Sequence, residues 1–213
     1  MLWAGAMIEN PLVAQVSRRS AILGGGAALA LASMPARALA AATPALPTPL
    51  LRRAMAAFQT HAGRLAHRDM LGVVDFSLPS RAPRFFLVDP ASGRSKALLV
   101  AHGRGSDPDH SGWVERFSNR PGSAASSPGS YVTAETYVGQ HGLSRRLVGL
   151  DAENSNARSR AIVVHSAWYV SDAMVAAHGK LGRSEGCLAV DAADLPYVLD
   201  RLGAGRLIYA GKV

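Results

Sequence analysis

From residue 70 onward the chain alternates short apolar runs with clusters of turn-forming residues, and this pattern constrains the fold most. The runs span residues 73–76, 84–88, 97–101, 131–138, 161–164 and 206–210. Between two of them, residues 89–93 combine Asp, Pro, Ser and Gly, which is typical of a hairpin turn. We therefore predict a mainly β fold, a β-sandwich decorated with a few short helices. A doubly wound parallel sheet is the weaker alternative, because strands and helices do not alternate.

Helical periodicity flanks this β region. Apolar residues recur at steps of four and three over residues 51–65, which predicts an amphipathic helix. A second helix is predicted over residues 195–202, with Asp191 or Asp194 as its cap. Residues 103–128 are rich in Ser, Gly, Pro and Asp and are expected to form a long polar loop.

The first 40 residues have the features of an export signal. Arg18 and Arg19 precede an apolar run over residues 21–34, and Ala38 and Ala40 form a small-x-small cleavage site. Paired arginines before a weakly apolar segment favour twin-arginine export, and the run is shorter than the ~20 residues that span a bilayer. We predict a signal peptide over residues 1–40, a linker over 41–50 and one folded domain over 51–213, located in the periplasm or cell envelope without a stable membrane anchor.

Charge and cysteine content narrow the function. The chain has 23 Lys and Arg against 15 Asp and Glu, a net charge of +8, which suits an anionic partner. Nucleic acid is disfavoured, because export removes that partner. The single cysteine, Cys187, has no disulfide partner within the chain and is therefore either an inert buried thiol or a nucleophile.

Residues near Cys187 in the sequence favour a nucleophile. His165 ends a predicted strand and can act as a base, while Lys180 and Arg183 add positive charge, so we predict a lowered thiol pKa. The N–H groups of Gly186 and Cys187 can face a developing oxyanion. Two alternatives stay open: a buried core cysteine with a structural histidine, and, less favoured, a zinc site. The zinc site would join Cys187 and His165 to His102, His141 or His178.

These segments resemble a known family. Residues 165–167, His-Ser-Ala, and 182–187, Gly-Arg-Ser-Glu-Gly-Cys, are similar to the catalytic signature of the murein L,D-transpeptidase (YkuD-type) domain. His102-Gly103 and residues 127–131 resemble its upstream segments, and the likeness runs over residues 73–209. The resemblance implies an enzyme acting on peptidoglycan stem peptides without metal or organic cofactor.

The resemblance also implies roles for individual residues. Cys187 would attack the carbonyl of the third stem residue, release D-alanine and form a thioester that an amine resolves, with His165 moving the proton. It further implies acylation of the thiol by carbapenems. Supporting roles fall to Gly186, Ser184 and Ser166, and substrate contacts to Arg183, Glu185, His102 and His141. A hydrolase on the same site and a non-catalytic wall-binding module remain alternatives.

The sequence departs from the family pattern around the nucleophile. Glu185 stands where the family usually has histidine, and Ala189 where asparagine is frequent. The interval of 22 residues between His165 and Cys187 is longer than usual, with a predicted helical turn over residues 171–178. We expect these changes to affect the acceptor: the side-chain amine of diaminopimelate is favoured, and the N-terminal alanine of a stem or another amine is the alternative.

Overall fold

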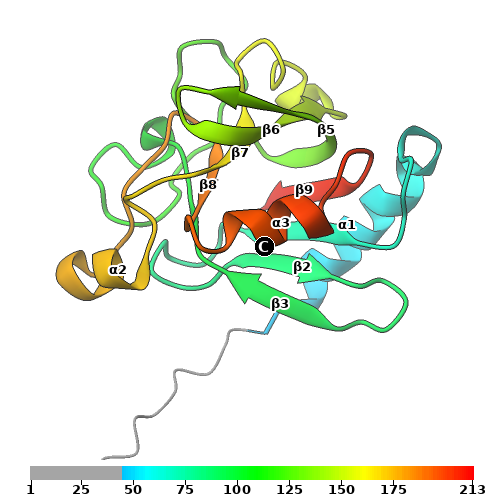
Figure 1. The fold of residues 1–213 in the computed structure, drawn as a ribbon, viewed down its shortest axis with the longest axis horizontal. Coiled ribbons are helices and arrows are strands. Elements are labelled where there is room, and N and C mark those ends of the chain that lie inside the picture. The colour runs from blue at the N-terminus through cyan, green and yellow to red at the C-terminus, as the bar shows by residue number, and fades with distance from the viewer. Residues whose placement is uncertain (1–44) are drawn as a thin grey trace, which may run out of the picture. The chain divides into compact units, whose positions relative to one another are not determined.

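The computed structural model describes residues 45–213, so the predicted signal peptide lies outside the described residues. These residues form one nine-stranded sheet with the strand order β3-β2-β1-β9-β5-β6-β7-β8-β4 (Figure 1). The strands are β1 (Leu71–Asp75), β2 (Phe85–Val88), β3 (Ser95–Leu98), β4 (Val100–Ala101), β5 (Gly129–Gly139), β6 (Gly142–Gly149), β7 (Val163–Ser166), β8 (Leu188–Val190) and β9 (Leu207–Gly211). The helices are α1 (Thr48–Thr60), α2 (Asp172–His178) and α3 (Leu195–Arg201).

The predicted mainly β class with a few short helices is confirmed. The two layers expected of a sandwich are the two halves of one continuous hydrogen-bonded sheet. β3 and β4 stand at opposite ends of the strand order, yet Leu99 alone separates them in the chain. The sheet must therefore curve back on itself. Its inner surface forms a single core in which Val74 and Phe85 from one half join Val164 and Leu188 from the other.

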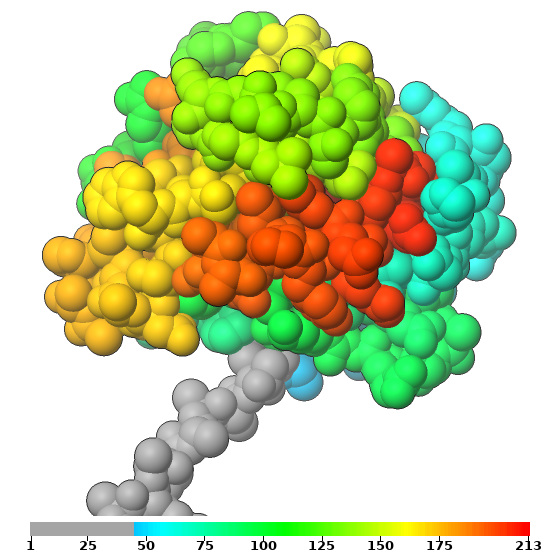
Figure 2. Space-filling model, in the orientation of Figure 1, coloured from blue at the N-terminus to red at the C-terminus, as the bar shows by residue number. Residues whose placement is uncertain are grey.

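Strands β1, β2 and β9 are buried on both faces because helices cover each side. Val73 of β1 packs in a cluster with the α1 stripe of Leu50, Ala54 and Phe58. The next residue, Val74, faces the opposite way, into the core that α3 completes. In Figure 2, α3 lies at the surface next to the β5–β6 hairpin. The first helix begins at Thr48, inside the segment predicted as linker, because Leu50 anchors it to the sheet.

Two predicted local features are confirmed. The 89–93 turn joins the antiparallel strands β2 and β3, with Asp89 accepting hydrogen bonds from the backbone N–H groups of Ala91 and Ser92. The predicted turn of helix is α2, which Ser171 caps by accepting from the Met174 N–H. It ends at Gly179, whose φ of 68° is one that glycine adopts easily.

Other features of the sheet differ from the sequence prediction. Strands β6 and β8 were not predicted. Strand β7, helix α2 and strand β8 form a βαβ unit, with β7 and β8 paired in parallel. Parallel pairing across a helical connection places the ends of both strands on the same edge of the sheet.

No helix within residues 45–213 is long and apolar enough to cross a membrane.

Candidate active site

Cys187 lies in a tight turn immediately before β8. Gly186 has a φ of 115°, and a Cβ at this position would lie 2.6 Å from the Ala125 carbonyl oxygen, so the turn requires glycine. The hydroxyl of Ser184 accepts from the Gly186 N–H at 3.1 Å and donates to the Cys187 carbonyl at 2.8 Å. Ser184 therefore holds the turn in shape, and of the two predicted oxyanion donors the Gly186 N–H is already engaged.

His165 lies on β7, beside the start of β8. The parallel register pairs His165 with Ala189, so Cys187 lies two residues before the partner of His165 and on the same face of the sheet. Strand spacing and rise place their Cα atoms roughly 8 Å apart, a separation that their two side chains can bridge directly or through one water. Both side chains line the same cavity.

The hydrogen bonding of His165 determines its tautomer. Nδ1 lies 2.8 Å from the Ser166 carbonyl oxygen, which can only accept, so Nδ1 carries the proton and Nε2 keeps its lone pair. Burial, the largest effect, and the nearby His141 lower the pKa of His165, although the Ser166 bond opposes them. The imidazole is therefore neutral near pH 7 and can accept a proton at Nε2. Ser166 contributes its backbone carbonyl here.

The thiol is protonated at rest. Sγ donates to the Ala161 carbonyl at 3.6 Å. Burial raises the pKa of the Cys187 thiol and Glu185 raises it further, while the backbone of Val163 and the charge of Arg160 act in the opposite direction. The sequence prediction of a lowered thiol pKa is wrong for this structure. Lys180 adds no charge at the thiol, because its ammonium donates to the His110 carbonyl outside the cavity.

The tip of the β5–β6 hairpin lies over His165. The ring of His141 stacks on the ring of His165, with centroids 4.3 Å apart and planes 22° from parallel. Gln140 is hydrogen bonded to His141 at 3.0 Å. Tyr137 from the same hairpin also lines the cavity. This hairpin thus forms one wall and screens a face of the His165 ring from solvent.

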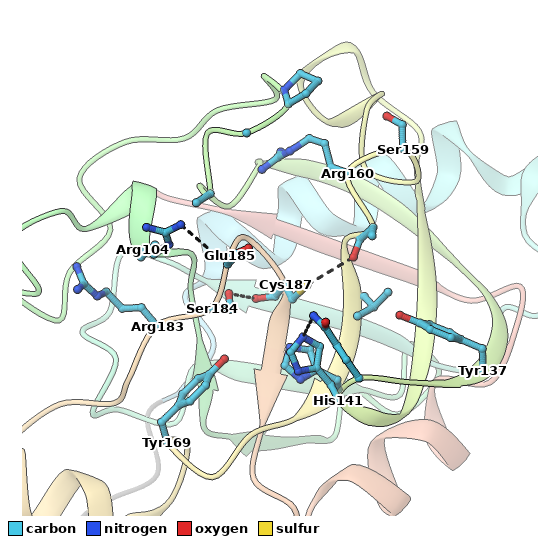
Figure 3. A pocket seen from close by; sticks show the side chains of 17 residues that line it. Arg104, Tyr137, His141, Ser159, Arg160, Tyr169, Arg183, Ser184, Glu185 and Cys187 are labelled. Atoms are coloured by element: carbon cyan, nitrogen blue, oxygen red, sulfur yellow. Dashed lines mark hydrogen bonds and ion pairs between the residues drawn. The ribbon is translucent and has the colours of Figure 1, made fainter.

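The cavity around Cys187 has a volume of about 920 Å³, and several charged side chains line its wall. Figure 3 shows Arg104, Arg160 and Arg183 around it, with Tyr137 and Tyr169 on opposite sides of Cys187. Glu185 pairs with Arg104 at 2.9 Å, and both side chains are largely exposed. Such a wall suits a ligand that carries both carboxylate and ammonium groups.

This geometry agrees with a comparison against protein families. The model of the L,D-transpeptidase catalytic domain matches residues 42–210. The chain belongs to this family. No curated protein matches it.

Solved L,D-transpeptidases show similarity to the domain at low sequence identity. One from Mycobacterium smegmatis is 14% identical with a TM-score of 0.42, covering 67% of this chain and 58% of that chain. One from Mycobacterium tuberculosis is 15% identical with a TM-score of 0.43, covering 67% and 57%. One from Xylanimonas cellulosilytica is 14% identical with a TM-score of 0.39, covering 74% and 68%. The match spans less than two thirds of the first two chains.

Within this L,D-transpeptidase domain, most predicted site residues come together. The cavity is lined by Cys187, His165, His141, Ser184, Arg183 and Glu185. Arg183 also donates to the backbone carbonyls of Asp107 and Pro108, which holds its guanidinium at the rim.

Among the predicted substrate contacts His102 is the exception, and its predicted contact with substrate is corrected. The side chain is completely buried and does not line the cavity. Its Nδ1 accepts from Arg84 at 2.7 Å and its Nε2 donates to Asp107 at 3.1 Å. Both ring nitrogens are occupied, so His102 holds the polar loop to the core.

Several residues of the wall were missed by the sequence analysis. They are Arg104, Tyr137, Arg160, Ala161 and Tyr169. None has a local signal, because each reaches the cavity from a loop or hairpin whose position depends on the fold. Within residues 45–213, no three His, Cys, Asp or Glu side chains gather closely enough to hold a metal ion.

Proposed function

We propose that this chain is an exported peptidoglycan L,D-transpeptidase that uses Cys187 as its nucleophile and His165 as its base. The observation that carries the proposal is the pairing of β7 with β8, which sets a neutral imidazole with a free Nε2 beside a thiol in one polar cavity. Family membership supports the reaction class.

Acylation begins from a neutral pair. As Sγ attacks the carbonyl carbon of the third stem residue, Nε2 of His165 takes the thiol proton. The Cys187 N–H is the candidate donor to the tetrahedral oxyanion, since the Gly186 N–H is engaged by Ser184. The intermediate then collapses, the C–N bond to the terminal D-alanine breaks, and His165 returns the proton to the leaving amine. A thioester on Cys187 remains.

Transfer reverses these steps with a new amine. The acceptor nitrogen attacks the thioester carbonyl, His165 accepts a proton from that nitrogen and delivers it to the departing Sγ, and a new amide joins two stems. The side-chain amine of diaminopimelate is the favoured acceptor. Glu185 lies exposed at the rim and can attract an ammonium group, so the N-terminal alanine of a stem is the alternative acceptor.

The decisive experiment incubates the purified chain with disaccharide tetrapeptide and analyses the products by mass spectrometry. Cross-linked dimers with loss of D-alanine are the expected result, and tandem spectra locate the new bond. Disaccharide tripeptide without dimers would show that water resolves the thioester, which identifies a hydrolase and contradicts transfer.

Cys187→Ala provides the control for the nucleophile. We expect it to fold like wild type and to lose turnover by at least about a thousandfold. A carbapenem should add its mass to the wild-type chain and not to this variant. Turnover that survives in Cys187→Ala would overturn the assignment, and a wild-type chain that binds peptidoglycan without converting it would identify a binding module.

A further inference from the structure

Arg160 makes an unusually complete set of contacts for a residue at a cavity wall. Its side chain extends from the loop before β7 to the facing 118–127 loop. Nη1 donates to the Ser118 carbonyl at 2.8 Å and to the Ser127 hydroxyl at 2.7 Å. Nη2 donates to the Ala125 carbonyl at 2.5 Å and to the Ser123 hydroxyl at 3.3 Å. The planar guanidinium therefore joins the two loops that form this side of the cavity.

The same guanidinium packs behind the turn that carries Cys187. A Cβ added to Gly186 would lie 3.1 Å from Arg160 Nη2 and 2.6 Å from the Ala125 carbonyl that Nη2 binds. The residue after Arg160, Ala161, has a φ of 54°, and its carbonyl accepts from Sγ. A left-handed alanine is strained and persists where surrounding contacts enforce it. Arg160 thus lies against Gly186, the residue before Cys187, while Ala161 contacts the thiol itself.

The charges around the sulfur make Arg160 the relevant cation. The titratable and charged groups near it are Glu185 on its own turn, His165 on β7, His141 on the hairpin, Tyr169 in the crossover, and Arg104, Arg160 and Arg183 on the wall. Arg104 is paired with Glu185, and Arg183 is held by carbonyls of another loop. Burial raises the pKa of the Cys187 thiol, and the charge of Arg160 opposes that shift. Burial lowers the pKa of Arg160, and the charges of Tyr131 and Cys187 oppose that shift.

We propose that Arg160 is a positioning residue for the nucleophile: it fixes the turn that carries Cys187 and supplies the positive charge that the thiolate meets as it forms. The inference rests on one part of the proposed function, namely that Cys187 is the nucleophile. The chain has one cysteine, so alkylation by iodoacetamide reports on this sulfur without requiring any turnover.

The test measures the alkylation rate against pH in the full chain and in three variants. Arg160→Gln should raise the midpoint of the profile by about one pH unit, since an opposite charge nearby lowers an acidic pKa by about that amount or more. Arg160→Lys keeps the charge and loses the planar fork, so its midpoint should stay within about half a unit of wild type. Arg158→Gln is the matched control, because Arg158 lies two residues away, pairs with Glu135 and does not line the cavity.

Each outcome decides between a charge effect and mere support of the fold. If Arg160→Gln melts at a lower temperature but keeps the wild-type midpoint, Arg160 is a structural residue and the proposal fails. A rise in Arg158→Gln equal to that in Arg160→Gln would also overturn it. Should Arg160→Gln not fold, Arg160→Lys carries the test, and a midpoint shifted by a full unit would contradict the proposal. A chain that alkylates as expected but forms no product would leave this inference standing and refute the proposed function.

Discussion

Two histidines that look alike in the sequence make different hydrogen bonds in the structure. His102 follows β4 and His165 lies near the end of β7, and a small residue comes after each. Both side chains are buried, at 0% and 1% exposure. Yet His102 uses both ring nitrogens inside the protein, whereas the bond of His165 to Ser166 leaves Nε2 free, in a ring that lines the same cavity as Cys187.

The comparison teaches that burial alone does not distinguish a structural histidine from the one proposed as the base. Burial lowers the pKa of both imidazoles, and the charge of Arg84 helps to bring that of His102 to about 4. Both rings are therefore neutral near pH 7. The difference is one unoccupied nitrogen that faces a cavity, which is what proton transfer requires.

The largest expected effect is a loss of turnover when His165 is substituted, which distinguishes His165 from His102. His165→Gln should lower turnover by about 10²–10⁴-fold, the usual contribution of a general base. Its free energy of unfolding should change by less than about 1 kcal/mol, because the variant loses one hydrogen bond. Steady-state kinetics and urea unfolding of this variant and of His102→Gln test the contrast. If both variants lose activity only in proportion to their unfolded fraction, the catalytic role of His165 is refuted.

Arg84, His102 and Asp107 form a buried hydrogen-bonded group, called here the buried centre. Substitution of Arg84 tests how much this group contributes to the free energy of unfolding. Its guanidinium donates to the carbonyls of Leu78 and Val100 and to His102. Arg84→Met would leave these acceptors unpaired in the core, so we expect a loss of roughly 3–5 kcal/mol in the free energy of unfolding. Arg94→Met, at an exposed turn position, is the control and should change stability by less than about 1 kcal/mol. Equal losses in the two variants would show that the buried centre is not a stabilising network.

The buried centre also predicts acid sensitivity. His102 has a pKa of about 4 when folded and near 6.5 when unfolded, so the unfolded chain binds the extra proton first. The stability that neutral His102 contributes is complete above pH 6.5 and is lost progressively as the pH falls from about 6.5 to about 4, by roughly 3 kcal/mol in all. Urea unfolding at several pH values should show a steeper decline for wild type than for His102→Gln. Parallel declines would contradict the assigned environment of this ring.

The smallest effect concerns the exposed pair at the rim. Glu185→Gln breaks an ion pair between two largely exposed side chains, so stability should change by less than about 1 kcal/mol. We expect the KM for the acceptor amine to rise while acylation by the donor stays unchanged, because the carboxylate acts on the ammonium group. Glu185→Asp should restore part of the KM. Unchanged acceptor kinetics in both variants would remove Glu185 from acceptor choice.

Local signals predicted those parts of the fold that local physics determines. The α2 helix has its capping serine and terminal glycine at Ser171 and Gly179, and the 89–93 hairpin has its turn residues. Cys187 and His165 were predicted to lie together from a motif that resembles a known pattern, and the structure places both at one cavity. The signal peptide stays a prediction.

The missed parts depend on contacts between distant segments. Strand β6 has Ser144 and Arg145 at buried positions, which breaks the apolar alternation that identifies a strand. The Arg145 guanidinium fits because it donates to the carbonyls of Ala134 and Leu199, and neither partner is near it in the sequence. Arg160 was missed for the same reason, since its acceptors lie on a loop 33 to 42 residues earlier.

The parallel pairing of β7 with β8 also explains why the number of residues between His165 and Cys187 can vary. Hydrogen bonds between the strands set the positions of His165 and Cys187, so the number of residues in the connecting segment is free to drift without disturbing either. Gly179, at the end of α2, has open space around it and is a natural point for an inserted sequence. Tyr169 and Arg183 belong to that same connection and form part of the cavity wall. If the proposed function holds, this connection can change in length and sequence, and the cavity wall with it, while Cys187 and His165 keep their positions.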